Sequence, residues 1–486
     1  MTSYHFRPVA IAPDHDRSFW LQDIAAGPAT APLSGQDDCD VAIIGGGYCG
    51  LWTALRLREQ QPDLRITVLE ADICGGGASG RNGGQVHTWF AEIDQLTRVV
   101  GAEQALMLAQ ATADAIEELA SLQASGTIDM DLRLDGWLWT ASARAQEGAW
   151  SGALAACAAQ GFAPLAPLST ADILRRSGSA VSYTGVVEER AGTVHPAKLA
   201  LGLRALAVSR GIALYEKTPV TRIDAGQPCT LHTPKGRVIA AKVVVATNAW
   251  ATALPELRRY VYVVDSQVIA TAPVPEILDR IGWTGGPSIC DAQAHVLYYQ
   301  RTPKGRVIFG RGSGRVAFAG AFGDSFNRNP APHRVADNRR EMVRVYPKLR
   351  STPVTHDWSG PIDCMAEHLP VFGHLKGQPN IFFGVGFNGT GIAQTPVAGR
   401  ILASLVLGRS DRWSRCGLVG LERRTPLPPE PIRYLGARIV RRAIRLRNDA
   451  EILNQSPGWL VRFLSDLKPG RHGPKPPAAD PSRTDS

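Results

Sequence analysis

Residues 40–50 read DVAIIGGGYCG, and a little further on residues 65–71 read RITVLEA. Both segments contain a short apolar run of the length and composition of a buried strand. A glycine-rich turn separates the first run from a predicted helix over 51–60. The order of strand, glycine-rich turn, helix and strand is typical of a βαβ unit that binds a dinucleotide.

Three glycines and one acid have separate roles in such a unit. Gly45 makes the tight turn, Gly47 lets a pyrophosphate approach the backbone, and Gly50 lets the helix pack closely on the strand. Backbone N–H groups and the helix dipole supply the positive end that a diphosphate requires. Glu70 ends the second strand, where it can accept hydrogen bonds from both hydroxyls of an adenosine ribose. The motif by itself is compatible with NAD or FAD.

Size and composition predict a two-domain protein of ordinary globular character. The chain has 486 residues, which exceeds the length at which a single hydrophobic core stops growing. Its composition, with 44% hydrophobic and 20% charged residues, is ordinary for a globular protein. It contains no apolar run long enough to span a bilayer, and its N-terminus shows no secretory signal. The eight cysteines have no zinc-like spacing, so we expect no metal, reduced thiols and a cytoplasmic location.

The nucleotide-binding unit is expected to be assembled from separated segments. A long apolar strand over 238–247 and another over 381–385 return the chain to the pattern of a parallel sheet, after intervening stretches rich in strands and helices. The predicted fold class is therefore α/β (α+β overall), with a discontinuous Rossmann-like domain and an inserted domain that has a mixed or antiparallel sheet. The expected boundaries are a leader over 1–38 that lies on the surface, the nucleotide-binding domain over 39–100, 190–258 and 355–410, the inserted domain over 101–189 and 259–354, a basic helical extension over 411–466, and a disordered tail over 467–486.

The formal net charge is +9, and arginines crowd the segment 433–447. A helical wheel places Arg438, Arg441, Arg442 and Arg445 on one face and Leu435, Ile439, Ala443 and Leu446 on the opposite face. We expect the apolar face to dock on the rest of the chain and the arginines to remain in solvent. A helix of this kind also suits the surface of an anionic membrane, which is the alternative interpretation.

Further glycine-rich and polar segments carry a resemblance to a known family. They read GGGASGRNGGQ (75–85), GTVHP (192–196), ATNAW (246–250), HDWSGPID (356–363), HLPVFG (368–373) and GVGFNGTGIAQTPVAGR (384–400). Together with the first motif they resemble the D-amino-acid oxidase (DAO) superfamily of FAD-dependent oxidoreductases, over roughly residues 15–410. Within it the chain resembles in particular the bacterial γ-glutamylputrescine oxidoreductase-like amine oxidases.

The resemblance implies a set of residues that contact FAD. It places Gly45, Gly47 and Gly50 at the pyrophosphate, Glu70 at the ribose and Val220 at the adenine. The segment beside the isoalloxazine ring contains Ser79, Arg81, Asn82, Gly83, Gly84 and Gln85. The segment at the pyrimidine end contains Phe387, Asn388, Gly389, Thr390 and Gly391, where a helix N-terminus would stabilise negative charge on reduced flavin.

The attachment of the cofactor is expected to be non-covalent. Some relatives tether FAD through a histidine near the SGRNGG position or a cysteine near the C-terminal glycine motif. Here Arg81 and Asn82 occupy the first place, and no cysteine lies within 375–400.

The expected reaction is hydride transfer from the carbon beside the nitrogen of a neutral amine or amino acid to flavin N5. The imine would then hydrolyse, and oxygen or another acceptor would reoxidise the flavin. On the segment HVLYYQR, Tyr299 and Arg301 share one face of a strand, where an aromatic ring would attract a cation and the arginine would bind a carboxylate. The alternative is that both are ordinary structural residues of the strand.

Three other functions stay open at this point. The first is a membrane-associated amine or amino-acid dehydrogenase that passes electrons to quinone. The second is a tRNA-modifying flavoprotein, which the positive charge would suit. The third is a non-catalytic flavin-binding subunit of a larger complex. No RNA-binding module is visible and the arginines gather in one late segment, so we expect a small-molecule amine substrate and no nucleic-acid partner.

Overall fold

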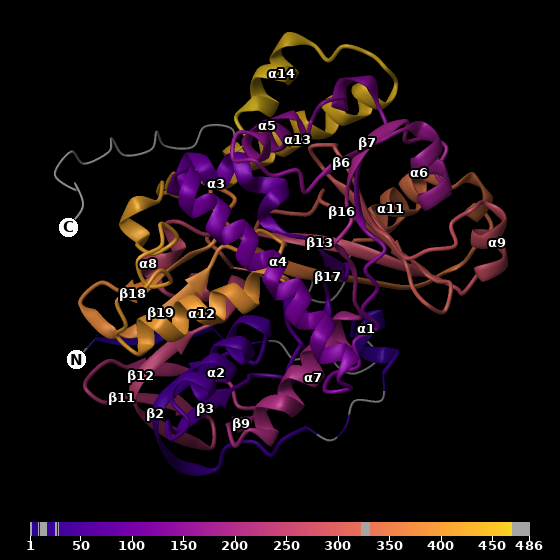
Figure 1. Ribbon diagram of the computed structural model, residues 1–486. Coiled ribbons are helices and arrows are strands. Elements are labelled where there is room, and N and C mark those ends of the chain that lie inside the picture. The colour runs from indigo at the N-terminus through magenta and orange to yellow at the C-terminus, as the bar shows by residue number, and fades with distance from the viewer. Residues whose placement is uncertain are drawn as a thin grey trace.

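A computed structural model describes residues 2–7, 9, 17–24, 27, 29–321 and 331–468 (Figure 1). Strand β2 (Gly35–Ile44) lies in the middle of a nine-stranded sheet, between β12 (Gly236–Val245) and β3 (Ile66–Leu69). All three run parallel, and every residue of β3 is buried. Such burial is typical of a parallel sheet covered on both faces, so the predicted Rossmann-like core is confirmed.

The other strands of this sheet extend the core on both sides. Two of them, β9 (Ala213–Tyr215) and β19 (Gln378–Val385), are parallel to their neighbours β3 and β12. The remaining strands pair antiparallel: β1 (Ser3–His5), β10 (Arg222–Asp224), β11 (Cys229–Thr233) and β18 (Val371–Leu375).

Two helices pack closely against each other beside this sheet. Helix α2 (Tyr48–Gln60) follows the glycine-rich turn, and α12 (Gln394–Val406) follows the turn at 386–391 (Figure 1). A Cβ at Gly399 would come within 2.9 Å of the Trp52 backbone, so the small residue permits the close approach of the helices. A third helix, α7 (Pro196–Ser209), packs on α2.

A second sheet has eight strands and is mostly antiparallel, as predicted for the inserted domain. Its only parallel pair among the described residues joins β14 to β5. In order the strands are β17 (Val354–Cys364), β13 (Tyr262–Thr271), β16 (Val307–Arg311), β15 (Leu297–Arg301), β14 (Ser288–Asp291), β5 (Trp137–Ala141), β7 (Thr184–Glu188) and β6 (Ala166–Leu168).

Further helices surround the two sheets. They are α3 (Ile93–Val100), α4 (Ala102–Ala124), α5 (Ser151–Ala158), α6 (Thr170–Ser177), α8 (Pro255–Arg258), α9 (Pro275–Arg280) and α11 (Pro332–Val345). A two-stranded ribbon of β4 (Gln85–Val86) and β8 (Gly192–Thr193) connects the segments that lead from one sheet to the other.

Two of the predicted boundaries need correction. Strand β17 was assigned to the nucleotide-binding segment 355–410, but it pairs along its length with β13 in the second sheet. The leader over 1–38 was expected to lie on the surface, yet α1 (Phe19–Gln22) is inserted into the molecule and Trp20 is 1% exposed. Both errors arise because neither the pairing of β17 with a distant strand nor the burial of a four-residue helix leaves a local pattern in the sequence. The other boundaries stay a prediction.

The C-terminal extension contains α13 (Ile432–Ile452) and α14 (Trp459–Asp466), drawn in yellow in Figure 1. The expected docking of α13 through its apolar face is wrong for Leu435, Ile439 and Leu446, which are about half exposed, although Ala443 is buried. Arg438 and Arg442 are exposed as expected, whereas two other arginines contact the rest of the molecule. Arg445 pairs with Asp337 at 2.8 Å, and Arg441 donates a hydrogen bond to the carbonyl oxygen of Gly312 at 2.9 Å.

The physical reason for this docking is that Asp337 and the Gly312 carbonyl offer acceptors to these two arginines, while a third arginine is held within the C-terminal extension itself. Arg447 pairs with Glu451 at 2.6 Å and with Asp466 of α14 at 2.9 Å. The expected disordered tail lies, from residue 469 onward, outside the described residues. No helix in the described part of the chain is both long and apolar enough to cross a membrane.

Candidate functional site

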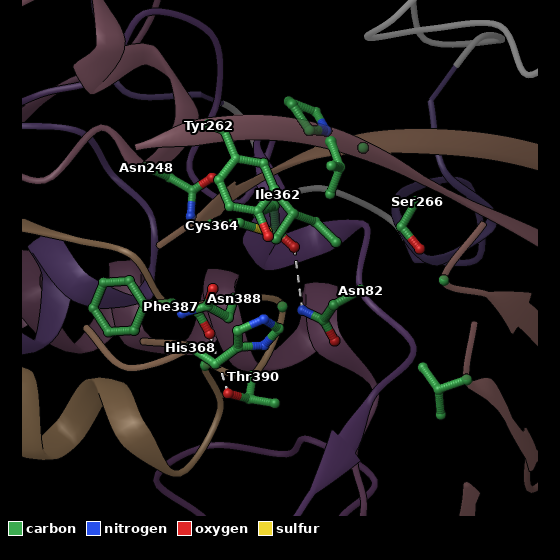
Figure 2. Close-up of a pocket in the computed structure, with 18 of the residues that line it drawn as sticks. Asn82, Asn248, Tyr262, Ser266, Ile362, Cys364, His368, Phe387, Asn388 and Thr390 are labelled. Carbon is green, nitrogen blue, oxygen red and sulfur yellow. Dashed lines mark hydrogen bonds between the residues drawn. The ribbon is translucent and has the colours of Figure 1, made fainter. Parts of the chain in front are cut away.

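A cavity of about 1330 Å³ lies where the two sheets and α13 meet. Its wall includes the glycine-rich turn before α2, the segment at 76–85, the turn at 387–391, strand β13 and the inner face of α13. Figure 2 shows Tyr262 and Ile362 on one side of the cavity and His368, Asn388 and Thr390 on the other. The volume exceeds that of a pocket for one drug-sized ligand, so it can hold a large cofactor together with a substrate.

The glycine-rich turn has the geometry that its sequence predicts. Gly45 has φ +112°, and a Cβ there would lie 2.4 Å from the Ala246 carbonyl oxygen. A Cβ at Gly50 would lie 2.0 Å from the carbonyl oxygen of Gly45. Gly45 and Gly47 line the cavity, whereas Gly50 does not. Gly50 therefore acts through helix packing, and the other two glycines leave the backbone at the start of α2 open to a ligand.

Glu70 lies beside this turn and is held in place by backbone donors. Its carboxylate accepts hydrogen bonds from the N–H of Gly46 at 2.7 Å and of Asp72 at 2.9 Å. Burial raises the pKa of Glu70 to about 7. The residue lines the cavity, as does Val220 a short distance away along the wall. This is the arrangement expected for a carboxylate that accepts hydrogen bonds from hydroxyl groups of a ligand.

The segment 79–85 contributes a rigid stretch of cavity wall. The Ser79 hydroxyl accepts a hydrogen bond from the N–H of Tyr48 at 2.9 Å, at the first residue of α2. The Asn82 amide donates to the Ser79 carbonyl at 2.9 Å and accepts from the N–H of Gly84 at 2.8 Å. The Arg81 guanidinium donates to the Gly76 carbonyl at 2.8 Å. These hydrogen bonds fix the side chains of Ser79, Arg81 and Asn82, which the sequence analysis expects to contact the cofactor.

Three residues of this segment also approach other parts of the molecule. Gly84 does not line the cavity, and a Cβ there would lie 2.4 Å from the Val194 carbonyl oxygen. Gly83 does line it, where a Cβ would come within 2.9 Å of the Tyr298 ring. Gln85 also lines the cavity and donates a hydrogen bond to the Ile289 carbonyl at 2.9 Å. The segment thus joins the first sheet to strands β14 and β15.

The turn at 387–391 is organised by an acid that the sequence interpretation missed. Asp363 is fully buried and accepts hydrogen bonds from the Gly386 N–H at 2.5 Å, the Phe387 N–H at 3.2 Å and the Asn248 amide at 2.7 Å. Burial raises its pKa to about 7. The signal was present, because Asp363 ends the segment HDWSGPID and Asn248 belongs to ATNAW. The five residues assigned to the pyrimidine end all line the cavity: Phe387, Asn388, Gly389, Thr390 and Gly391.

The structure corrects the two proposed catalytic residues. Tyr299 is 2% exposed and packs against Phe309 and Tyr346 in the core of the second sheet. Arg301 pairs with Asp279 at 2.7 Å, away from the cavity. Side chains alternate along a strand, so the neighbouring Tyr298 is the one that lines the cavity. The shared face of Tyr299 and Arg301 was predicted correctly, but it is the face turned to the core.

Aromatic and titratable groups complete the wall. Tyr262 of β13 and Tyr298 of β15 both line the cavity, and the hydroxyl of Tyr298 is 2.6 Å from that of Ser266. The His87 ring stacks on Trp137, with centroids 5.0 Å apart. Burial lowers the pKa of His87 to about 4, so the imidazole is neutral near pH 7. In the described ranges, no three or more His, Cys, Asp or Glu residues form a group that could hold a metal ion.

Fold and cavity together define a dinucleotide-dependent enzyme with a large, partly aromatic pocket at the carboxyl edge of a Rossmann-like sheet. Comparison with known proteins gives the family: residues 40–405 match the model of the DAO family, described as FAD dependent oxidoreductase. The chain belongs to this family, and its cofactor is FAD.

Relatives in sequence and in structure span most of the chain. It is 31% identical over 385 residues to γ-glutamylputrescine oxidoreductase of Escherichia coli, covering 77% of this chain and 85% of that protein. It is 28% identical over 408 residues to the probable oxidoreductase OrdL of Haemophilus influenzae, covering 82% and 90%. The crystal structure of glycine oxidase from Geobacillus kaustophilus superimposes with a TM-score of 0.64 at 22% identity, covering 77% of this chain and 96% of that one.

Proposed function

We propose that the protein binds FAD non-covalently in this cavity and oxidises a C–N bond of an amine or amino acid. The observation that carries the proposal is that fourteen of the sixteen residues assigned to FAD line one cavity, and Gly50 and Gly84 support it from behind. Two relatives bear names that fit this chemistry: γ-glutamylputrescine oxidoreductase of E. coli and glycine oxidase of G. kaustophilus.

The residues present fit this cofactor. Gly45 and Gly47 expose backbone at the start of α2, where a side chain at 45 would meet the Ala246 carbonyl. Glu70 accepts hydrogen bonds from backbone N–H groups and has capacity left for ribose hydroxyls. The turn at 387–391 is held by Asp363 and lines the same cavity as Asn82. When bound, FAD supplies the hydride acceptor and returns the electrons to oxygen or another acceptor.

The chain's own residues bind and orient the amine and keep water out. Tyr262 and Tyr298 offer aromatic faces that attract a cationic or partly positive nitrogen. His87 is neutral and buried against Trp137, so it does not repel an approaching amine. The substrate must give up its own ammonium proton before it reacts, because hydride leaves readily only from a carbon beside an unprotonated nitrogen. This role requires a closed apolar pocket and no strong base.

A panel of amines tests the proposal. Purified protein is expected to be yellow, and its flavin colour should bleach under anaerobic conditions with at least one primary amine, secondary amine or amino acid. Admission of oxygen should restore the colour and yield peroxide and an aldehyde, ketone or oxo acid. Bound flavin that no member of the panel bleaches would contradict the proposal.

A second candidate function concerns the surface of the C-terminal helices. Nine exposed large apolar side chains gather on α13, α14 and the residues beside them: Ile432, Leu435, Ile439, Leu446, Leu453, Trp459, Leu460, Phe463 and Leu467. Exposed arginines accompany them, including Arg438, Arg442 and Arg462. An apolar patch flanked by positive charge is complementary to an anionic bilayer. We propose that this face contacts the membrane peripherally, with quinone as the electron acceptor in that case, and that the protein otherwise resides in the cytoplasm.

Flotation with vesicles tests this second candidate. The protein should bind vesicles that contain anionic lipid and dissociate as salt is raised, and the double variant Trp459→Ser, Phe463→Ser should lose binding. Vesicles of neutral lipid are the control. A protein that stays unbound to anionic vesicles, or that is dimeric through this face, would contradict it.

A further inference from the structure

Helix α13 presents a guanidinium to the cavity from outside the family-matched region. Arg441 lines the cavity with its neighbours Val440 and Ala437, and it is close enough to Tyr262 to interact electrostatically with it. One N–H donates to the Gly312 carbonyl at 2.9 Å. Across the described ranges, Arg441 forms no ion pair with an acidic side chain. The cavity therefore contains a cation that no acidic side chain among the described residues pairs with directly.

A buried histidine lies on the same wall. His295 is 4% exposed, lines the cavity, and has no hydrogen-bond partner for either ring nitrogen among the described residues. Burial and four neighbouring cations hold its pKa well below the ordinary value: Arg441, Arg311, Lys468 and Arg445. The imidazole is therefore neutral and has one N–H to donate. An unpartnered buried donor of this kind is costly unless a ligand accepts its hydrogen bond.

The positive charge behind His295 is also left without a carboxylate. Arg311 is 1% exposed, two of its guanidinium nitrogens have no partner, and no ion pair joins it to an acid in the described part of the chain. Asp291, which also lines the cavity, accepts hydrogen bonds from the Gln293 amide and from the Leu297 N–H, and three other acids near this wall are paired with arginines. Asp265 binds Arg315 at 2.7 Å, Asp337 binds Arg445 at 2.8 Å and Asp466 binds Arg447 at 2.9 Å. An anion in the cavity would balance this excess.

We propose that Arg441 and His295 form an anion subsite that binds a carboxylate of the substrate, so that this chain acts on carboxylated amines. A guanidinium can bind a carboxylate through two parallel hydrogen bonds, and the histidine N–H supplies another donor. Arg441 of α13 thus takes the carboxylate-binding role that the sequence led us to expect of Arg301. The substrate class rests on the proposed function, whereas the subsite itself can be tested without turnover.

The test is calorimetric titration of the flavin-containing protein with benzoate and with benzamide, which have nearly the same shape and differ in charge. Wild type should bind benzoate at least about tenfold more tightly than benzamide. Arg441→Met should weaken benzoate binding by about tenfold to a hundredfold and leave benzamide binding unchanged. Arg442→Met is the matched control, because Arg442 is exposed on the same helix and should leave both affinities unchanged.

Arg441→Lys guards against a variant that fails to fold. It keeps the positive charge and loses the two-pronged hydrogen bonding, so benzoate should bind several-fold more weakly while benzamide is unaffected. Equal binding of the two probes by wild type, undetectable binding of benzoate, or full benzoate affinity in Arg441→Met and Arg441→Lys would overturn the subsite. If these results hold but no amine bleaches the flavin, the subsite stands and the proposed function fails.

Discussion

The glycine-rich turn and the C-terminal helix α13 both contribute to one cavity, yet their sequences were unequally informative. At the turn, residues 45–50 predicted a backbone geometry, and the structure has that geometry. At α13, the helical wheel predicted two faces but only part of their surroundings: Arg438 and Arg442 are exposed as expected, whereas the leucines of the apolar face are not buried. Turn geometry is determined within a few residues, whereas the surroundings of a helix face are determined by distant segments.

The difference has a physical origin in what each region must bury. The turn buries backbone against backbone, where only glycine fits, so the residue type itself carries the information. Helix α13 covers a surface that offers Asp337 and the Gly312 carbonyl, so arginines gain more from contact than leucines do. Periodic apolar residues therefore predict that a helix has an apolar face, but they do not predict whether that face is buried or which segment packs on it.

The largest expected effect is at the turn. Gly50→Ala places a Cβ 2.0 Å from the Gly45 carbonyl oxygen, so α2 must shift and the backbone donors beside the cavity lose their positions. We expect the variant to bind FAD at least about a hundredfold more weakly, a loss of about 3 kcal/mol. The ratio of flavin to protein after purification measures this. Gly458→Ala is the control, because its Cβ would meet no atom within 4 Å, and stoichiometric flavin in Gly50→Ala would contradict the account.

The next effect tests which face of α13 is buried. Ile444 is 3% exposed and Leu446, two residues later, is 47% exposed. Ile444→Ala should lower the free energy of unfolding by about 2–4 kcal/mol through the cavity it leaves. Leu446→Ala should change it by less than about 0.5 kcal/mol. Chemical denaturation of both variants measures the difference, and a larger loss for Leu446→Ala would restore the orientation expected from the sequence.

A smaller effect concerns a buried acid on the cavity wall. Burial and the neighbouring Glu188 and Asp94 raise the pKa of Glu92 to about 8. The folded state therefore keeps a proton on Glu92 that the unfolded state releases near pH 4.5. The contribution of this proton to the free energy of unfolding is fully present below pH 4.5 and is lost as the pH rises through about 8. Glu92→Gln removes this dependence.

The measurement for Glu92 is the free energy of unfolding at pH 5 and at pH 9. Glu92→Gln should match wild type at the lower pH and exceed it by about 1–3 kcal/mol at the higher pH. Asp449→Asn, a substitution at an exposed acid of α13, should leave the profile of wild type unchanged. A profile of Glu92→Gln that parallels wild type would show that Glu92 is ionised in the folded protein throughout.

Local chemistry was predictable from sequence, and long-range placement was not. The parallel core, the mostly antiparallel second sheet and the residues at the start of α2 follow from short motifs and strand patterns. Tyr299 shows the limit, because alternation predicted its partner Arg301 on the same face but could not say that this face is the core. Asp363 reaches the turn at 387–391, and Arg441 reaches the cavity, through pairing of strands and helices far apart in the chain, which no local pattern encodes.

The most direct test of a cavity shared by both regions is the rate of anaerobic flavin reduction by a carboxylated amine that wild type oxidises. The account predicts equal flavin content in wild type, Arg442→Met and Arg441→Met. It predicts the wild-type rate at subsaturating amine for Arg442→Met and a rate lower by at least about tenfold for Arg441→Met. An unchanged rate in Arg441→Met would contradict the claim that α13 completes the site.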